Sequence, residues 1–238
     1  DLVRENAWRG REQPEYELLD TGIFNEDRYW DVFTEYAKGD EDDLLIKITA
    51  HNRGTESADL WLLPTLWFRN LWSFGLMKEK PSITAVGETE VSLSHEKLGD
   101  YHFYFQTPAR LLFTENETNR EHLWNQPNDS PFVKDAFHTA LINNDFEILE
   151  GKTEGTKFAP LYQVTVEGGS SAEFQFRLSK QALKTPFGKD FEKIFAERKM
   201  EADEFYETIA ANSTNQHPTT NNQQREIQRQ ALAGMLWS

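Results

Sequence analysis

The stretch DLLIKITAHNRG (residues 43–54) decides the fold class. Its residues alternate in character, and one face is formed by Leu44, Ile46, Ile48 and Ala50. A period of two is typical of a half-buried β-strand, and Gly in the last position marks a turn. The sequence therefore predicts a strand that has one face in a core and that ends near residue 54.

The same alternation recurs at SAEFQFRLSK (171–180), where the side chains expected to face inward are Ala172, Phe174, Phe176 and Leu178 and those expected outward are Glu173, Gln175 and Arg177. YQVTVEGG (162–169) precedes it, and the turn GGSS (168–171) predicts a hairpin between the two strands. Further strands are expected in YELLDTGIF (16–24), RYWDVFTEYAK (28–38), ADLWLLPTLWF (58–68), ITAVGETEVSL (83–93), YHFYFQ (101–106) and RLLFTEN (110–116). Many short strands with short turns predict a large, mainly antiparallel β-sandwich over residues 1–183.

The period changes after residue 183. FEKIFAERKMEADEFYETI (191–209) repeats its apolar residues at helical spacing, and Pro186 and Gly188 precede it. A polar stretch (212–224) follows, and a second apolar helix is expected from about Gln223. We interpret residues 184–238 as linker helices, and we expect the chain to be a segment of a longer protein.

Composition excludes several classes of function. The chain has 238 residues, a net charge of −15 and no cysteine. Such an acidic chain is poorly suited to bind nucleic acid or anionic membranes, and it offers no disulfide or thiolate chemistry. It shows no signal peptide and no apolar run long enough to span a bilayer, so we expect a cytoplasmic protein.

Motifs that bind cofactors or metals are missing from the sequence. It has no Gly-rich phosphate loop, no nucleophile elbow and no HExxH pair, so we expect no cofactor and no metal. The run GDEDD (39–43) could bind calcium, but it lacks the alternating ligand spacing of an EF-hand loop. A solvated hairpin turn is the favoured interpretation.

Two stretches are candidates for a site. PTLWFRNLWSFG (64–75) could be buried core, a platform for sugar rings or a domain interface, because Trp and Arg suit all three. LLFTENETN (111–119) runs from an apolar strand into carboxylates and amides, which offer directional hydrogen bonds to sugar hydroxyls. A strand that ends in a polar turn is the simpler interpretation of the second stretch.

These stretches, together with DLVRENAWRGRE (1–12), SPFVKDAFH (130–138), EADEFYETI (201–209) and RQALAGMLWS (229–238), resemble the amino-terminal half of large bacterial proteins similar to glycoside hydrolase family 63. The resemblance implies a supersandwich that precedes an (α/α)6 barrel, and the barrel holds the acid and base of an inverting α-glucosidase. The barrel is absent from this chain, so no catalytic residue can be carried over.

The resemblance implies that the sandwich braces the barrel and helps to shape its substrate cleft. We expect Leu66 and Phe68 to face the core, and we assign to the cleft or interface Trp67, Arg69, Asn70, Trp72, Glu115, Asn116, Glu117 and Asn119. The expected partners are the barrel of the same parent chain and a carbohydrate. A stand-alone carbohydrate-binding module and a sugar-active sandwich enzyme remain alternatives. For the chain alone we expect self-association, or a terminal helix folded back onto the sandwich.

Overall fold

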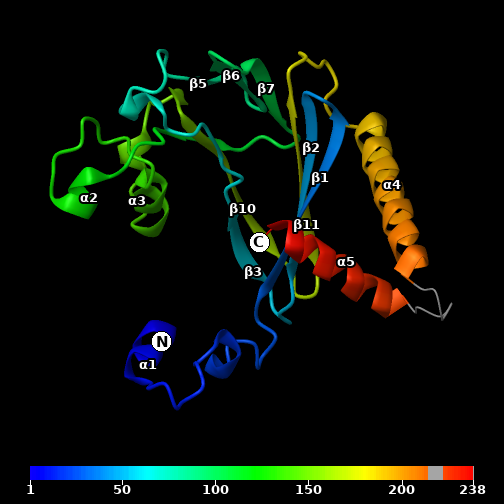
Figure 1. Cartoon of the computed structure of the whole chain (residues 1–238). Coiled ribbons are helices and arrows are strands. Elements are labelled where there is room, and N and C mark those ends of the chain that lie inside the picture. Colours follow the sequence, from blue (N-terminus) through cyan, green and yellow to red (C-terminus); the bar gives the residue numbers. More distant parts are fainter. Residues whose placement is uncertain (214–221, 238) are drawn as a thin grey trace.

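The structure, a computed structural model, describes residues 1–213 and 222–237. Two antiparallel sheets pack face to face, and helices lie on both outer sides and at both ends of the chain (Figure 1). Within the described residues, no helix combines the length and the apolar character needed to cross a membrane. The prediction of a mainly antiparallel β-sandwich followed by helices is confirmed.

The strands divide into a larger and a smaller sheet. The larger has the order β1 (Trp30–Asp40), β2 (Asp43–Asn52), β11 (Ser171–Ser179), β7 (Gly99–Phe105), β6 (Glu90–His95), β5 (Ser82–Ala85) and β9 (Glu154–Gly155). The smaller has β10 (Lys157–Val166) paired with β3 (Ala58–Leu62), β4 (Leu66–Trp67) and β8 (Arg110–Thr114).

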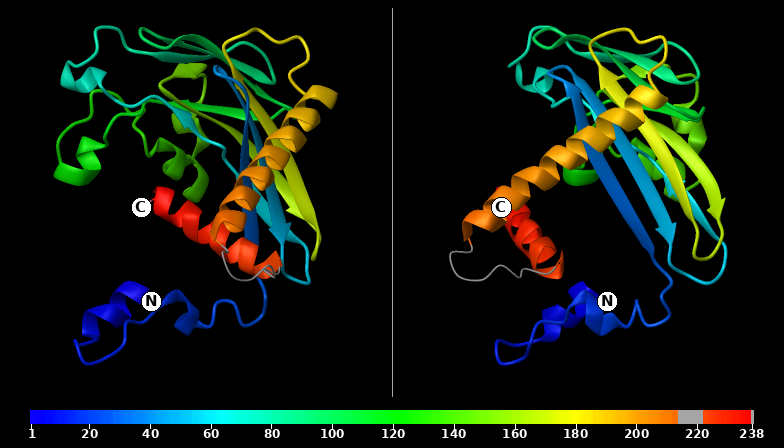
Figure 2. Two further views of the ribbon diagram at one scale, coloured as in Figure 1. Left: turned by 45° about the vertical axis from the view of Figure 1, so that its right-hand side comes forward. Right: turned by 90° about the vertical axis from the view of Figure 1, so that its right-hand side faces the viewer.

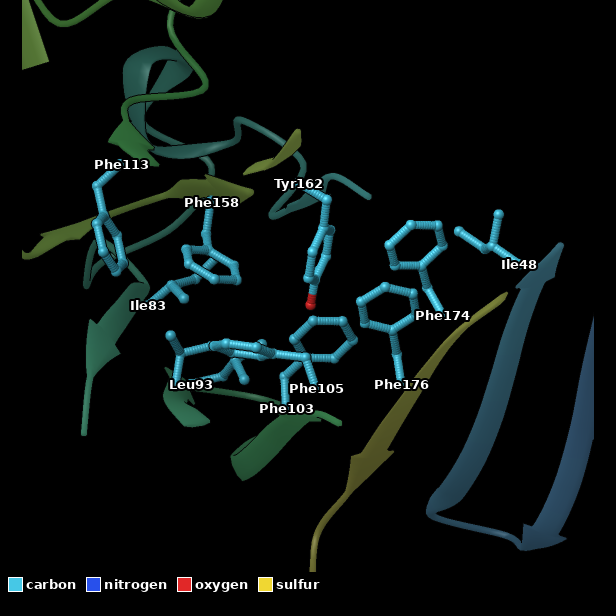
Figure 3. Packing of buried hydrophobic residues seen from close by; sticks show 11 residues of the cluster. Ile48, Ile83, Leu93, Phe103, Phe105, Phe113, Phe158, Tyr162, Phe174 and Phe176 are labelled. Carbon is cyan, nitrogen blue, oxygen red and sulfur yellow. The ribbon is translucent and has the colours of Figure 1, made fainter. Parts of the chain in front are cut away.

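The core between the sheets is rich in aromatic rings (Figure 3). Alternation in β11 places Phe174 and Phe176 in this core, and Phe176 stacks on Phe103 of β7 with ring centroids 5.9 Å apart. Ile48 reaches the same cluster from β2, as the alternation of residues 43–54 predicts. The period-two pattern therefore located the inner face of the larger sheet.

Helices cover both outer faces of the sandwich. On the smaller sheet, α3 (Ala136–Ile142) and the 3-10 helix η3 (Phe146–Leu149) pack on apolar side chains of β8 and β10. On the larger sheet, α4 (Lys189–Ser213) inserts Phe191 against Ala37 and Leu45. The remaining helices are α1 (Leu2–Trp8), η1 (Leu18–Thr21), η2 (Trp72–Phe74), α2 (Arg120–Trp124) and α5 (Asn222–Trp237).

The expected strand at residues 16–24 is wrong, because this segment forms η1. Glu17 and Asp20 make a reciprocal capping box, and the Asp20 carboxylate accepts a 2.8 Å hydrogen bond from the Glu17 amide. Gly22 then ends the turn with a φ of 69°. Local side-chain bonds therefore override the strand-like composition of this segment.

The expected hairpin at residues 168–171 is also wrong. The turn exists, but it passes from β10 in the smaller sheet to β11 in the larger one. Each strand has other partners, since β11 pairs with β2 and β7 and β10 pairs with β3, β4 and β8. Gly168 is required there, because a Cβ on it would lie 2.3 Å from the carbonyl of Thr55.

Of the three side chains of β11 that were expected to face outward, Gln175 and Arg177 are buried and Glu173 is exposed. Arg177 is buried and its Nε and Nη2 donate to the Asp43 carboxylate at 2.8 and 2.6 Å, while its Nη1 donates to the Pro186 carbonyl at 3.0 Å. Gln175 donates to Glu192 of α4 at 2.8 Å. The first turns of α4 are thus part of the sandwich, although the predicted boundary between residues 183 and 184 precedes them.

The acidic run at residues 39–43 forms the turn between β1 and β2. Besides the Asp43 pair with Arg177, Asp42 accepts a 2.6 Å bond from the Tyr101 hydroxyl. In the described part of the chain, no group of three or more His, Asp and Glu side chains is placed to hold a metal ion.

The second expected helix is α5, and it lies against α4 instead of the sheets. Arg229 pairs with Asp203 at 2.5 Å, and Arg225 pairs with Glu207 at 3.5 Å. Arg229 also lies over the ring of Tyr206 at 4.7 Å. Most of the expected polar stretch, and the side chain of Leu236, lie outside the residues whose positions are described.

Candidate functional site

The two stretches selected from the sequence leave the smaller sheet side by side. Strands β4 and β8 flank β10 and both run antiparallel to it, so they run in the same direction. Their last residues, Trp67 and Thr114, pair with the same residue, Lys157. The segments that follow, 68–75 and 115–119, therefore start at the same end of β10 although they are far apart in the sequence.

Hydrogen bonds join these two segments. The Asn116 side chain donates to the Phe68 carbonyl at 2.8 Å. Trp72 Nε1 donates to Glu117 Oε1, also at 2.8 Å. Asn116, Glu117 and Trp72, which the sequence placed in a cleft or interface, therefore hold the two loops to each other.

Two lysines complete this cluster. Lys80 Nζ lies 3.1 Å from Glu115 and 2.9 Å from Glu117, and Lys152 Nζ lies 3.0 Å from Glu115. The hydroxyl and amide of Thr156 also donate to Glu115, at 2.9 and 3.2 Å. Only 13% of the Glu115 side chain is exposed, so this carboxylate is an anchor inside a paired network.

The electrostatics keep Glu115 ionised. Burial by itself would raise the pKa of Glu115, but the hydrogen bonds from Lys152 and Thr156 and the charge of Lys80 hold that pKa below its usual value. For Lys80, burial would lower the pKa, but the bond to Glu117 and the charge of Glu115 raise it. The pair is therefore a salt bridge at neutral pH, and Glu115 is a poor proton donor.

The side chains of the first stretch alternate as expected. Leu66 and Phe68 pack against the core between the sheets, whereas Trp67 and Arg69 are exposed. Arg69 makes no hydrogen bond or ion pair with residues 1–213 or 222–237, so its guanidinium is available to a partner. Leu66 and Phe68 thus belong to the core, whereas Trp67 and Arg69 face outward.

A groove of about 320 Å³ opens between the two loops and α2. It is lined by Asn70, Ser73, Phe74, Glu117, Thr118, Arg120, Trp124, Asn128, Asp129, Ser130 and Val133. Trp124 is 60% exposed and Phe74 is 74% exposed, so two aromatic faces stand among amides, hydroxyls and carboxylates. Aromatic faces can stack on apolar ring faces, and the polar groups beside them can donate or accept hydrogen bonds.

The polar lining is held in place by local bonds. Asn70 and Ser73 exchange two hydrogen bonds, at 3.0 and 3.1 Å. Asn119 does not line the groove. Instead it caps α2 by accepting from the His122 amide at 3.0 Å, and it binds Asn128 and Asp135. Asn119 thus shapes the wall that carries Trp124.

Sequence reasoning missed several contributors to this region. Lys80, Lys152 and Thr156 come from other parts of the chain, and no local pattern marks them. Phe74 lay inside the quoted stretch but was not assigned to the site. Trp124 could have been found, because Asn119 precedes REHLW as a helix cap does.

No family model matches the chain. A search among curated proteins finds an uncharacterized protein of Saccharomyces cerevisiae, YMR196W, that is 29% identical over 283 residues. The match covers 100% of this chain and 26% of the yeast protein. The chain thus spans about a quarter of the length of the relative that it resembles.

Proposed function

We propose that this chain is a non-catalytic β-sandwich domain of an α-glucosidase-like glycoside hydrolase, which braces the catalytic domain and forms one wall of the substrate cleft. The observation that carries the proposal is the groove between the two loops. It presents exposed Trp124 and Phe74 beside Asn70, Glu117 and Asn128. Aromatic faces can stack on pyranose rings while amides and carboxylates bind their hydroxyls.

The carboxylates argue for a supporting role. An inverting glycosidase needs an acid and a base separated by the width of a sugar and a water molecule. Glu115 and Glu117 instead bind the same Lys80 nitrogen, which leaves no space for a sugar between them. Asp129, the other carboxylate in the groove, lies 3.5 Å from Arg120. The acid and base would come from the catalytic domain.

A larger parent protein is supported by the yeast relative, of which the matched region is only 26%. The resemblance to glycoside hydrolase family 63 supplies the proposed reaction, which is hydrolysis of an α-glycosidic bond with inversion. Arg69, which is exposed and unpaired among the described residues, suits an anchor on the neighbouring domain.

The experiment is turnover of a panel of α-glucosides by this chain and by the full-length gene product. We expect activity only in the full-length protein. There, Trp124→Ala should raise KM about tenfold, which corresponds to about 1.4 kcal/mol. Trp61→Ala is the control, since Trp61 is also exposed but lies on β3 beside Phe146. Turnover by this chain alone, or equal effects of the two variants, would contradict the proposal.

A stand-alone carbohydrate-binding module is the second candidate, and the exposed aromatic faces of the groove favour it. Calorimetric titration of this chain with α-gluco-oligosaccharides separates the two functions. A carbohydrate-binding module should bind these sugars by itself, and Trp124→Ala should abolish that binding. A cleft wall binds them only weakly until the opposite wall is present.

A further inference from the structure

The first 29 residues form an arm that carries apolar side chains outside the sandwich. None of residues 1–29 is buried. The large apolar side chains exposed on the arm are Val3, Trp8, Leu18, Leu19, Ile23 and Phe24, and Trp8 is 85% exposed. Figure 1 and both turned views in Figure 2 place α1 apart from the two sheets. Large exposed apolar side chains concentrated in one segment are a feature of interaction sites.

The arm nevertheless has a defined internal structure. The Asn6 side chain bonds both backbone groups of Tyr16, accepting from its amide at 2.8 Å and donating to its carbonyl at 2.9 Å. Arg9 lies over the Tyr16 ring at 4.9 Å and donates to the Pro14 carbonyl at 2.6 Å. These bonds, together with the capping box of η1, fold the arm into a hook.

The arm makes too few packing contacts with the sandwich to keep this structure by itself. Helix α1 has seven residues, and helices of this length are not stable in water without tertiary packing. The junction to the sandwich is narrow, where the Arg53 amide donates to the Tyr29 carbonyl at 3.0 Å. A covering surface must therefore supply the burial that this chain does not.

The charge of the arm and the length of the yeast relative indicate which surface covers the arm. The arm holds eight acidic and four basic residues, so an anionic membrane or a nucleic acid would repel it. The yeast relative, which matches this whole chain, has about three quarters of its length outside the match, since 26% is matched. A second folded domain in the same polypeptide is thus the partner that the comparison makes available.

We propose that the arm is a strap: residues 1–29 dock their apolar side chains on the domain that, under the proposed function, shares the parent polypeptide with this sandwich. The inference rests on the proposed function for the existence of that domain. It assigns a second contact, at the end of the sandwich that carries α1 and far along the chain from the groove.

Hydrogen exchange read peptide by peptide tests the strap, in this chain and in the full-length gene product. Three regions are compared: the arm (2–24), the groove (117–126) and the exposed turn before β7 (95–99). We expect amides of the arm to exchange at least about tenfold more slowly in the full-length protein, whereas the turn is unchanged. Equal exchange of the arm in both proteins overturns the inference.

The readouts separate this inference from the proposed function. Protection of the groove without protection of the arm overturns the strap and leaves the cleft wall in place. Protection of the arm alone supports the strap and counts against the cleft wall. Protection of the arm in this chain alone that grows with concentration overturns the strap in favour of a second copy, which light scattering would show as a dimer.

A matched pair of variants sharpens the test. Leu19→Asp places a charge on an exposed leucine of the arm, and Leu98→Asp does the same in the turn before β7. In the full-length protein, Leu19→Asp should return the arm to the fast exchange of this chain alone, and Leu98→Asp should not. If Leu19→Asp leaves the slow exchange intact, its side chain is not in the interface and the strap is overturned.

Discussion

The segments that precede and follow the sandwich both carry apolar residues, but only the start of α4 buries them against it. At the start of α4, Phe191 is fully buried against Ala37 and Leu45, and Gln175 donates to Glu192 of the same helix. Arg177 donates to the carbonyl of Pro186, just before α4 begins. The amino-terminal arm has comparable side chains and buries none of them. The comparison shows which apolar residues belong to the core of this chain and which it leaves exposed.

The largest expected effect is at Phe191. Phe191→Ala should lower the free energy of unfolding of this chain by about 4 kcal/mol, because it leaves a cavity between α4 and the larger sheet. Trp8→Ala, at an exposed residue of the arm, should change it by less than about 0.5 kcal/mol. Urea unfolding measures both. Similar losses for the two variants would mean that the arm is part of the core.

The second effect concerns the buried ion pair between Arg177 and Asp43. Arg177→Ala leaves the largely buried Asp43 without its partner, so we expect a loss of about 3 kcal/mol. The control is Lys180→Ala, which removes an exposed ion pair with Asp42 and should cost less than about 1 kcal/mol. If Arg177→Ala costs no more than Lys180→Ala, the Arg177–Asp43 pair is not held away from water.

The third and smallest effect concerns the loop cluster, and it depends on pH. Glu115→Gln should cost about 1 kcal/mol at neutral pH, since the charge partner of Lys152 and Lys80 is lost. The pKa of Glu115 is lowered in the folded state, so its contribution is complete above the ordinary value of 4.5 and disappears as pH falls through the lowered pKa. Urea unfolding of the original protein and of Glu115→Gln, measured from neutral to acidic pH, should therefore give free energies of unfolding that converge at low pH. A difference in the free energy of unfolding that grows as the pH falls would contradict the expected direction of this pH dependence.

Strand β11 shows most clearly what could and could not be predicted from the sequence. Alternation placed Phe174 and Phe176 in the core, but it could not show that the opposite face of the strand lies under a helix, because both faces of a covered sheet can carry polar residues. It also could not show that residues 168–171 pass between sheets, since a tight turn has the same composition in either case. The period of the apolar residues shows which face of a strand is buried. The strands with which it pairs depend on the rest of the chain.

The site shows the same limit. The stretches at 64–75 and 115–119 were each recognisable from their residue types, yet their meeting depends on β10 pairing with both preceding strands through Lys157. Lys80 and Lys152 carried no local signal, because a lysine in a turn is usually solvated. The cluster that fixes the groove is therefore a product of topology.

The most direct test of the central claim is an experimental structure of the full-length gene product with a slowly hydrolysed α-glucoside bound. The account predicts that the groove lined by Phe74, Trp124 and Asn128 faces the bound sugar across a cleft, with Arg69 against the neighbouring domain. A groove that opens to bulk solvent, away from the sugar and from every other domain, would contradict it.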